Sequence, residues 1–280
     1  MTTPHTAQLP LGVSLNALDP EQQLATVERL AGSSVKAVEL WEPEFNKSER
    51  HVAEMRRLLA AAGVTARTVH AAFGGSLDLS SPDPATVEAG LDAFRAALDL
   101  AVRMQAPMVV VHASAEPIGD EERAPRMAEA KRSIRTMADA AGKAGCRIAV
   151  ELLPRTCLGN SGQELLTLLE GTDPSTAGVC LDTNHLMANF AALPDVVRSL
   201  GPRLIALHCS DYDGVDEKHW PPLRGVIDWP AFLAALRDVG FPGPLNYEAA
   251  LDGETLDEKL AFLEDNYAQL VSGTASQGVP

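Results

Sequence analysis

Short apolar segments recur along the chain, and each is followed by a polar residue and then by a longer stretch of mixed character. These segments are rich in Val, Ile and Leu, and they lack the strict alternation of strands that have one face in water. They are therefore typical of parallel strands, which are buried on both faces. We predict eight such strands, at residues 11–15, 36–41, 66–70, 107–112, 147–153, 178–182, 203–208 and 244–249.

The stretches between these segments have the periodicity of helices. In residues 51–63, HVAEMRRLLAAAG, apolar side chains recur at the spacing of one helix face. Asp228 stands where a helix N-cap is expected, and Pro230 falls in the first turn that follows. We predict helices at about residues 20–31, 51–63, 84–105, 121–144, 161–170, 187–200, 229–239 and 254–271. Glycines suited to a left-handed C-cap follow six of them, at positions 32, 63, 145, 171, 201 and 240.

Strands and helices that alternate eight times in a chain of 280 residues favour a (β/α)8 TIM barrel, an α/β fold. The alternative is a doubly wound open sheet, which usually carries a glycine-rich phosphate loop after its first strand. The segment LGVSLNALDP, at 11–20, has no such loop. Because no linker or low-complexity tract interrupts the pattern, we expect one domain at residues 9–272, with flexible tails at 1–8 and 273–280.

Composition and charge narrow the range of partners. No apolar run approaches the roughly 20 residues of a membrane span, and the N-terminus lacks the layout of a signal peptide, so we expect a cytoplasmic protein. The formal net charge of −15 disfavours nucleic acid and anionic membranes and favours small-molecule chemistry. The four cysteines show no CxxC pair, so we expect reduced thiols.

Seven of the eight predicted strands end in an ionisable residue. In a barrel enzyme the carboxyl ends of the strands converge on one mouth, where the chemistry takes place. A single strand-end carboxylate is usually a cap or a surface ion pair, but a repeated pattern at one end of the fold indicates a site. The residues are Glu39, His70, His112, Glu151, Asp182 with His185, His208 with Asp211, and Glu248. Glu39 is the weakest member, and Asp211 and Asp213 also suit a turn after the seventh strand.

Several carboxylates in a partly dry pocket repel one another unless a cation lies between them. We therefore predict one divalent metal ion, and three carboxylates with one imidazole suit Mn²⁺ first, then Mg²⁺ or Co²⁺, with Zn²⁺ possible. No thiolate is expected, because strand alternation should turn Cys180 and Cys209 away from the ligands. The expected ligands are Glu151, Asp182, His208 and Glu248.

The motifs that carry these residues resemble a known family. ELLPR, CLDTNH, LIALHCSD and LNYEAA, together with TVHAAFG around His70 and VVVHAS around His112, resemble the xylose isomerase-like superfamily of sugar phosphate isomerases and epimerases. The segment KHWPPLRGVIDW, at 218–229, resembles a loop of that family, although PPLRG stands where its epimerases often have a Gly-Glu-Gly turn. The resemblance implies the same four metal ligands, a substrate contact at His185, and Glu151 and Glu248 as the acid/base pair.

The expected reaction is a proton transfer beside a carbonyl, through an ene-diolate that the metal stabilises as a Lewis acid. This chemistry suits isomerisation or epimerisation of a ketose or related polyol ketone. Glu151 and Glu248 are expected well apart across the mouth, on opposite sides of the substrate. Further substrate contacts are expected at His70, His112 and Trp41, with Phe73 and Trp220 as additional apolar walls, and at Arg155 and Arg224 for an anionic group.

Three other functions remain open at this stage. A dehydratase of inosose or dehydroshikimate type would use the same site, with a general acid that expels a hydroxyl group. A three-zinc apurinic endonuclease is a less favoured reading, because of the acidic charge and because Asp216 and His219 have the wrong spacing for an Asp-x-His pair. A barrel without catalytic activity is the third, and a homodimer or homotetramer is possible for each. The nuclease pattern would use His70, His112, Glu151, Asp182, His185, His208, Asp216, His219 and Glu248.

Overall fold

The computed structural model describes residues 8–19 and 21–273, so most of the two tails predicted from sequence lies outside the described residues. The described chain forms a parallel eight-stranded sheet in the order β10-β1-β2-β3-β4-β5-β6-β7. The strands are β1 (Leu11–Ser14), β2 (Val35–Trp41), β3 (Thr65–His70), β4 (Met108–Val111), β5 (Arg147–Glu151), β6 (Ala177–Asp182), β7 (Leu204–His208) and β10 (Leu245–Tyr247).

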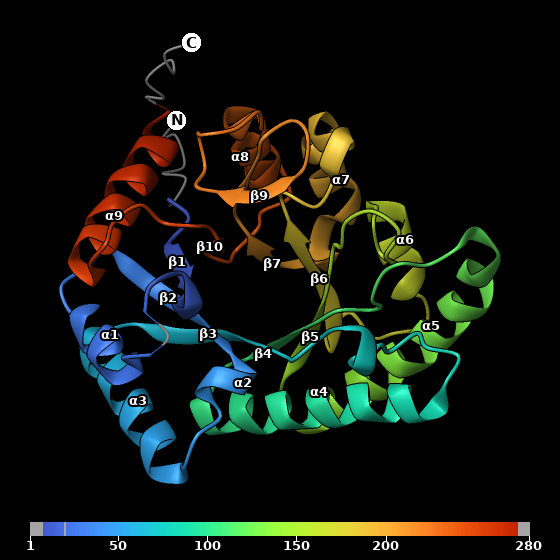
Figure 1. Ribbon diagram of the computed structural model, residues 1–280. Helices are drawn as coiled ribbons and strands as arrows, with labels where there is room; N and C mark the ends of the chain where they lie inside the picture. Colours follow the sequence, from blue (N-terminus) through green and yellow to red (C-terminus); the bar gives the residue numbers. More distant parts are fainter. Residues whose placement is uncertain (1–7, 20, 274–280) are drawn as a thin grey trace, which may run out of the picture.

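The sheet closes where β7 meets β10. The backbone N–H of Cys209 donates to the carbonyl of Asn246 at 2.7 Å, and the N–H of Glu248 donates to the carbonyl of Cys209 at 3.3 Å. The carboxyl ends of all eight strands therefore surround one mouth, as the repeated pattern of apolar segments predicts. Figure 1 shows the strands at the centre and the helices around them.

A helix forms at each of the eight predicted places, and seven of them begin and end within a few residues of their expected ends, while the one predicted at 187–200 begins later. They are α1 (Gln23–Arg29), α3 (Glu49–Ala62), α4 (Pro84–Met104), α5 (Asp120–Lys143), α6 (Gly162–Leu168), α7 (Leu193–Leu200), α8 (Trp229–Asp238) and α9 (Leu256–Ser272). Asp228 caps α8 by accepting from the N–H of Ala231, and Gly63 ends α3 in the left-handed conformation, both as expected.

The structure departs from the predicted elements in two places. Residues 187–200 are not one α-helix: Met187–Ala192 form a 3₁₀ helix, and α7 begins only beyond it because Pro194 is tolerated in a first turn but not in a helix interior. A hairpin of β8 (Asp211–Tyr212) and β9 (Glu217–Trp220) follows β7 and was not predicted, since its strands are short and polar. Short turns of helix also occur at α2 (Glu42–Phe45), Leu15–Ala17, Gly75–Leu77 and Gly201–Arg203.

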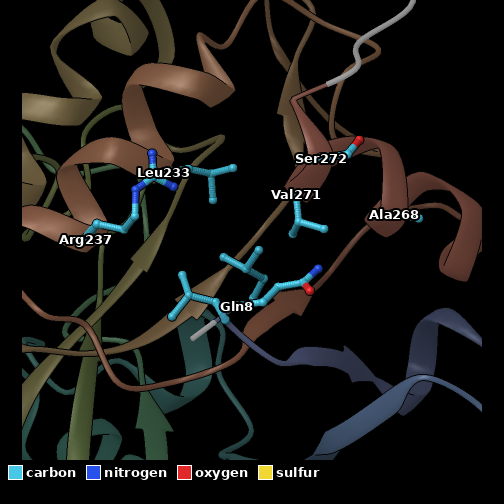
Figure 2. A pocket seen from close by; sticks show the side chains of 8 residues that line it. Gln8, Leu233, Arg237, Ala268, Val271 and Ser272 are labelled. Atoms are coloured by element: carbon cyan, nitrogen blue, oxygen red, sulfur yellow. The ribbon is translucent and has the colours of Figure 1, made fainter. Parts of the chain in front are cut away.

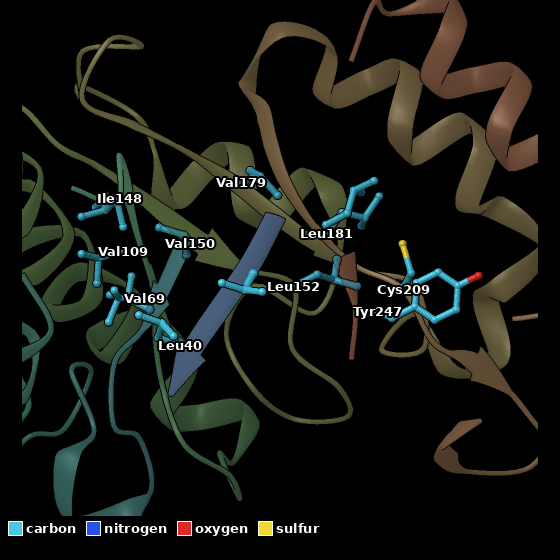
Figure 3. Packing of buried hydrophobic residues seen from close by; sticks show 14 of the residues in the cluster. Leu40, Val69, Val109, Ile148, Val150, Leu152, Val179, Leu181, Cys209 and Tyr247 are labelled. Carbon is cyan, nitrogen blue, oxygen red and sulfur yellow. The ribbon is translucent and has the colours of Figure 1, made fainter. Parts of the chain in front are cut away.

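Two groups of buried apolar side chains support the strands. The large group fills the space between the strands and the helices, and Figure 3 shows part of it, with Val150, Leu181 and Tyr247 packed among their neighbours. The small group consists of Met108, Val110, Ala149, Cys180, Ile205 and Ala206. Several of its members stand two residues before a strand tip, so their side chains and those of the tips share one face, the inside of the barrel.

This placement corrects one expectation about the cysteines. Cys180 stands two residues before Asp182 on β6, so alternation puts both side chains on the same face rather than on opposite faces. Burial raises the pKa of the Cys180 thiol, so the group stays protonated and is no thiolate ligand. Cys209 belongs to the outer group, as expected. None of the four cysteines forms a disulfide, and no helix among residues 8–19 and 21–273 has the length and apolar character needed to cross a membrane.

Candidate metal centre and active site

Two adjoining cavities open at the mouth of the barrel. The larger, of about 430 Å³, is lined by side chains from the tips of β3, β4 and β5 and from the loops that follow them. The smaller, of about 290 Å³, lies toward β1 and β2. His70, His219 and Glu248 line both. The predicted strand tips thus meet in one place, where a substrate can reach them.

A third cavity, of about 420 Å³, lies between α8 and α9 and is drawn in Figure 2. Leu9, just before β1, and Leu245, the first residue of β10, both line it, so it lies at the end of the barrel opposite the mouth. Its lining is mostly apolar, and Arg237 is its one ionisable side chain among the described residues. Barrel enzymes carry their chemistry at the other end, so we assign the active site to the mouth.

The four predicted metal ligands come together at the mouth. One ligand atom from each of Glu151, Asp182, His208 and Glu248 lies within 4.8 Å of all the others. The Nδ1 atom of His208 is 2.9 Å from Glu248 Oε2 and 3.1 Å from Glu151 Oε1. Glu151 and Glu248 are consequently closer together than the sequence suggested, since both carboxylates face the same point.

Asp182 provides a test of whether this set fits a cation. The side chain is fully buried, and its Oδ1 accepts from the N–H of Asn184 at 2.7 Å. Its Oδ2 is buried with no hydrogen-bond partner among the described residues, and burial raises the pKa of the group. Three carboxylates, one of them with a buried free oxygen, and one imidazole are the ligands that Mn²⁺ or Mg²⁺ prefers, so the residues fit a divalent cation.

Glu39 orients the imidazole of this set. The Nε2 of His208 donates to Glu39 Oε2 at 3.0 Å, and the same oxygen accepts from the hydroxyl of Thr68 at 2.8 Å. Burial alone would lower the pKa of His208, but the neighbouring Cys180, Glu248 and Glu39 outweigh it and raise that pKa well above its usual value. This contact leaves Nδ1 facing the other carboxylates, which is the arrangement of a metal-bound histidine supported by a carboxylate.

The two glutamates differ in exposure and in their neighbours. The side chain of Glu151 is 2% exposed, and its Oε2 accepts from His70 Nε2 at 3.0 Å and from His112 Nε2 at 3.1 Å. Burial opposes its ionisation, but the charges of His208 and His112 hold its pKa well below the usual value. The side chain of Glu248 is 31% exposed, and despite burial the charge of His208 lowers its pKa to about 2. Both are therefore carboxylates at neutral pH.

His185 lies beside the metal set and contacts the hairpin. Its Nδ1 donates to the carbonyl of Leu152 at 2.8 Å and lies 3.6 Å from Asp182 Oδ2. Its Nε2 is 3.4 Å from Glu217 Oε2, an oxygen with no hydrogen-bond partner among the described residues. Sequence reasoning missed Glu217. The available signal was its place two residues before His219, which puts both side chains on one face of a strand.

The two predicted anion contacts are already paired within the protein. Arg155 lies at the larger cavity, where its guanidinium binds Glu116 at 3.0 Å, Asp216 at 2.9 Å and Glu217 at 3.0 Å. Arg224 pairs with Asp252 and does not line either cavity of the mouth. Each guanidinium is therefore already neutralised by carboxylates of the protein, and the predicted contact with an anionic group stays a prediction.

Aromatic side chains form one wall of the mouth. The ring centroid of Phe73 is 3.9 Å from that of His112, with the rings stacked, and 5.1 Å from that of Trp41. Trp41 in turn lies 5.3 Å from His70. Trp220, also predicted there, is not part of the lining of either cavity. The predicted apolar wall therefore consists of Trp41 and Phe73.

Among the described residues, the mouth contains two further groups of side chains whose atoms could hold a metal ion. His70, His112 and Glu151 form one, and Asp182, His185 and His219 form the other, each with its ligand atoms within 4.8 Å of one another. Asp216 belongs to neither group and pairs with Arg155 instead. This agrees with the sequence argument that the spacing of Asp216 and His219 does not suit an Asp-x-His metal-binding pair. Asp211 and Asp213 accept backbone N–H groups in the turns around the hairpin, as expected.

Comparison with known proteins identifies the family but leaves the activity to be argued. The chain is 29% identical over 203 residues to an L-ribulose 3-epimerase from Methylomonas sp. (strain DH-1), which covers 69% of this chain and 67% of that enzyme. It is 25% identical over 252 residues to a 3-dehydroshikimate dehydratase from Pseudomonas putida, covering 86% of this chain but 37% of that enzyme.

Among solved structures, a D-tagatose 3-epimerase-like protein has the same fold, with a TM-score of 0.80 and 21% identity over 96% of this chain and all of that one. A sequence profile of the xylose isomerase-like TIM barrel family matches residues 27–266. This match confirms the resemblance noted in the strand-tip motifs and covers most of the barrel. The chain belongs to the xylose isomerase-like TIM barrel family.

Proposed function

We propose that this protein is a divalent-metal-dependent epimerase or isomerase that moves a proton next to the carbonyl of a ketose or related polyol ketone. The observation that carries the proposal is the four-ligand set, in which Asp182 keeps a buried free oxygen and Glu151 and Glu248 face the same point. The similarity to an L-ribulose 3-epimerase supports the sugar substrate.

A divalent cation held by the four residues would supply Lewis-acid stabilisation of negative charge on the substrate oxygens. Either Glu151 or Glu248, as a carboxylate, can remove the proton from carbon, and epimerisation is completed when the other glutamate, protonated from water, delivers a proton to the opposite face of the same carbon. Glu151 is buried and its Oε2 is held by two histidines, so its position is fixed. Glu248 is partly exposed and can exchange its proton with water. Epimerisation in D₂O should therefore introduce deuterium at the reacting carbon.

The charge of the mouth favours a substrate without phosphate. The larger cavity is lined by Glu116, Glu151, Glu217 and Glu248, and the guanidinium of Arg155 is already bound to three carboxylates. An added phosphate would meet like charges and no free cationic side chain among the described lining residues. We therefore propose a neutral ketose rather than a sugar phosphate.

The proposal is tested by loading the protein with Mn²⁺ and following hydrogen exchange at carbon in D₂O, over a panel of free ketoses and inososes. We expect exchange with at least one ketose, and a loss of about 10²–10⁴-fold in Glu151→Gln and Glu248→Gln. Glu28→Gln, which changes an exposed residue of α1, is the matched control and should keep full activity. Metal binding with no exchange over the whole panel would instead identify a barrel without catalytic activity.

A dehydratase is the second candidate, because the chain is similar over most of its length to part of a 3-dehydroshikimate dehydratase. The same two carboxylates would remove a proton and release a β-hydroxyl group as water. Incubation with inosose and 3-dehydroshikimate, followed by ultraviolet absorbance for a conjugated product, distinguishes the two reactions. A conjugated product without epimerised sugar would replace the epimerase proposal.

The two further groups of ligand atoms keep the three-metal hydrolase open as a lesser candidate. Metal analysis of the purified protein separates it from the epimerase. One exchangeable ion for each chain supports the epimerase, whereas three tightly bound zinc ions, with cleavage of an abasic duplex, would support the hydrolase.

A further inference from the structure

The two cavities at the mouth are arranged as lobes on either side of the proposed reaction centre. His70, His219 and Glu248 line both, so they form the boundary between the lobes. Glu248 is also one of the four metal-ligating residues. A substrate placed over Glu248 can therefore extend into the larger lobe, into the smaller lobe, or into both.

Most polar groups in the larger lobe are already engaged within the protein, and Glu217 Oε2 is the exception among the described lining residues. His112 donates to Glu151, His185 donates to the carbonyl of Leu152, and Arg155 binds three carboxylates. This lobe thus offers a fixed and strongly acidic surface around the reacting atoms. Its shape suits one polar end of a ketose held next to the metal-ligating set.

The smaller lobe differs because three of its polar groups, those of Ser14, Asn16 and Trp41, have no hydrogen-bond partner among the described residues, whereas Glu39, His70 and His219 are engaged. Ser14 is 6% exposed, and no described residue provides a hydrogen-bond partner for its hydroxyl group. The side-chain amide of Asn16, which is exposed, and the indole N–H of the half-buried Trp41 also have no partner among residues 8–19 and 21–273. A buried hydroxyl, an amide and an aromatic ring on one small cavity are the groups that bind the hydroxyls and the C–H face of a sugar ring.

We propose that the smaller lobe is a second sugar subsite, and that the natural substrate is a ketose carrying a glycosidically linked sugar or similar neutral polyol. This inference rests on the proposed function, because it places the reacting ketone over Glu248. The linked ring lies against Trp41, and its hydroxyls bind Ser14 and Asn16. The linked group is expected to be neutral because Glu39 would repel an anion. Among the described residues, Glu39 is the one ionisable residue that lines the smaller lobe but not the larger lobe.

The test compares free D-fructose with two glycosylated fructoses, isomaltulose and lactulose, in the Mn²⁺-loaded protein. Hydrogen exchange at carbon gives kcat/KM, and calorimetry gives Kd without requiring turnover. We expect at least one disaccharide to exceed D-fructose by about tenfold in kcat/KM or in affinity. Asn16→Phe and Ala250→Phe, which reduce the space of the smaller lobe from two sides, should both remove this preference, and Ala250→Phe should leave D-fructose within twofold of the unmodified protein.

Other outcomes separate the two proposals. D-Fructose turnover with no preference for either disaccharide overturns the subsite and keeps the epimerase. A parallel loss for D-fructose and disaccharide in Ala250→Phe means that one ketose spans both lobes, which also overturns it. Disaccharide binding that Asn16→Phe weakens, without exchange at carbon, supports the subsite and contradicts the proposed reaction. Trp41→Phe, which keeps the ring and removes the N–H, should lower the preference by less than the filling variants do.

Discussion

Replacing Asp182 with Asn should make the metal-free protein more stable while removing its response to metal. Asp182 is fully buried, and its Oδ2 has no hydrogen-bond partner among the described residues, although His185 Nδ1 lies 3.6 Å away. Burial raises the pKa of this carboxyl in the folded chain, so the stability that its protonated form provides is lost as pH rises through that value. At neutral pH the ionised group therefore opposes folding of the metal-free protein. Asn removes the charge and keeps an oxygen that can accept from the N–H of Asn184.

The expected gain comes from the loss of a buried charge, because the amide nitrogen of Asn is also buried without a partner but a neutral group costs less than an ionised one; we take the difference as about 1–3 kcal/mol. About 1 kcal/mol moves the melting temperature of a chain of this size by roughly 2–4 °C, so we expect an increase on the order of 5 °C in EDTA. In Mn²⁺ at 100 times its Kd, the unmodified protein should gain about 2.7 kcal/mol. Asp182→Asn should gain little, since one of the four ligands has lost its charge.

The assay is thermal unfolding with EDTA and with MnCl₂, and Asp211→Asn is the matched control. Asp211 is equally buried, but its Oδ1 accepts from the N–H of Tyr212 and of Ile227, and its Oδ2 accepts from Trp229 Nε1 at 2.8 Å. We expect this control to lose about 1–3 kcal/mol with and without metal. A lower melting temperature for metal-free Asp182→Asn, or an unchanged response to Mn²⁺, would refute the reasoning.

Three further predictions concern the metal and the charge of the mouth. Glu39→Gln should weaken Mn²⁺ binding, measured by calorimetry, by about 10–100-fold because Glu39 orients His208. Thr68→Val, which removes only the hydroxyl that donates to Glu39, should have a smaller effect. Equal affinities of Glu39→Gln and the unmodified protein would exclude this role. Because the pKa of His208 is raised in the metal-free protein, protons compete with the metal for Nδ1. The affinity for Mn²⁺ should therefore increase from pH 6 to 9, by up to about tenfold per pH unit, and an affinity that does not change with pH would contradict this competition. A ketose phosphate should bind roughly tenfold or more weakly than the free ketose, because Arg155 is already paired; tighter binding in a competition assay would overturn the neutral substrate.

The barrel and the four-ligand set could be predicted from the sequence because both depend on local, periodic information. A buried parallel strand is a short apolar run, and its carboxyl end is the first polar residue after that run. Glu151 and Asp182 are the last residues of β5 and β6, and His208 is the last residue of β7. The fold then brings these ends together without any further information from the sequence.

The contacts that were missed depend on residues far apart in the chain. Arg155 was expected to be free for an anion, but Glu116 and Asp216, which neutralise it, stand 39 and 61 positions away. Arg224 likewise pairs with Asp252, 28 positions away. The side-chain pairing of exposed loops has no periodicity that a single sequence reveals. The error over Cys180 was of another kind, since the period of two along β6 already placed it beside Asp182.

The charges at the mouth would make a proton and the proposed metal ion alternatives in this protein. In the metal-free state, His208 faces carboxylates from both ring nitrogens, Nε2 toward Glu39 and Nδ1 toward Glu151 and Glu248. A protonated ring satisfies all of these oxygens, but it leaves Asp182 Oδ2 with no partner. A divalent cation would instead replace the Nδ1 proton and also bind Asp182. The free oxygen of Asp182 is therefore the feature that favours metal over proton at this site.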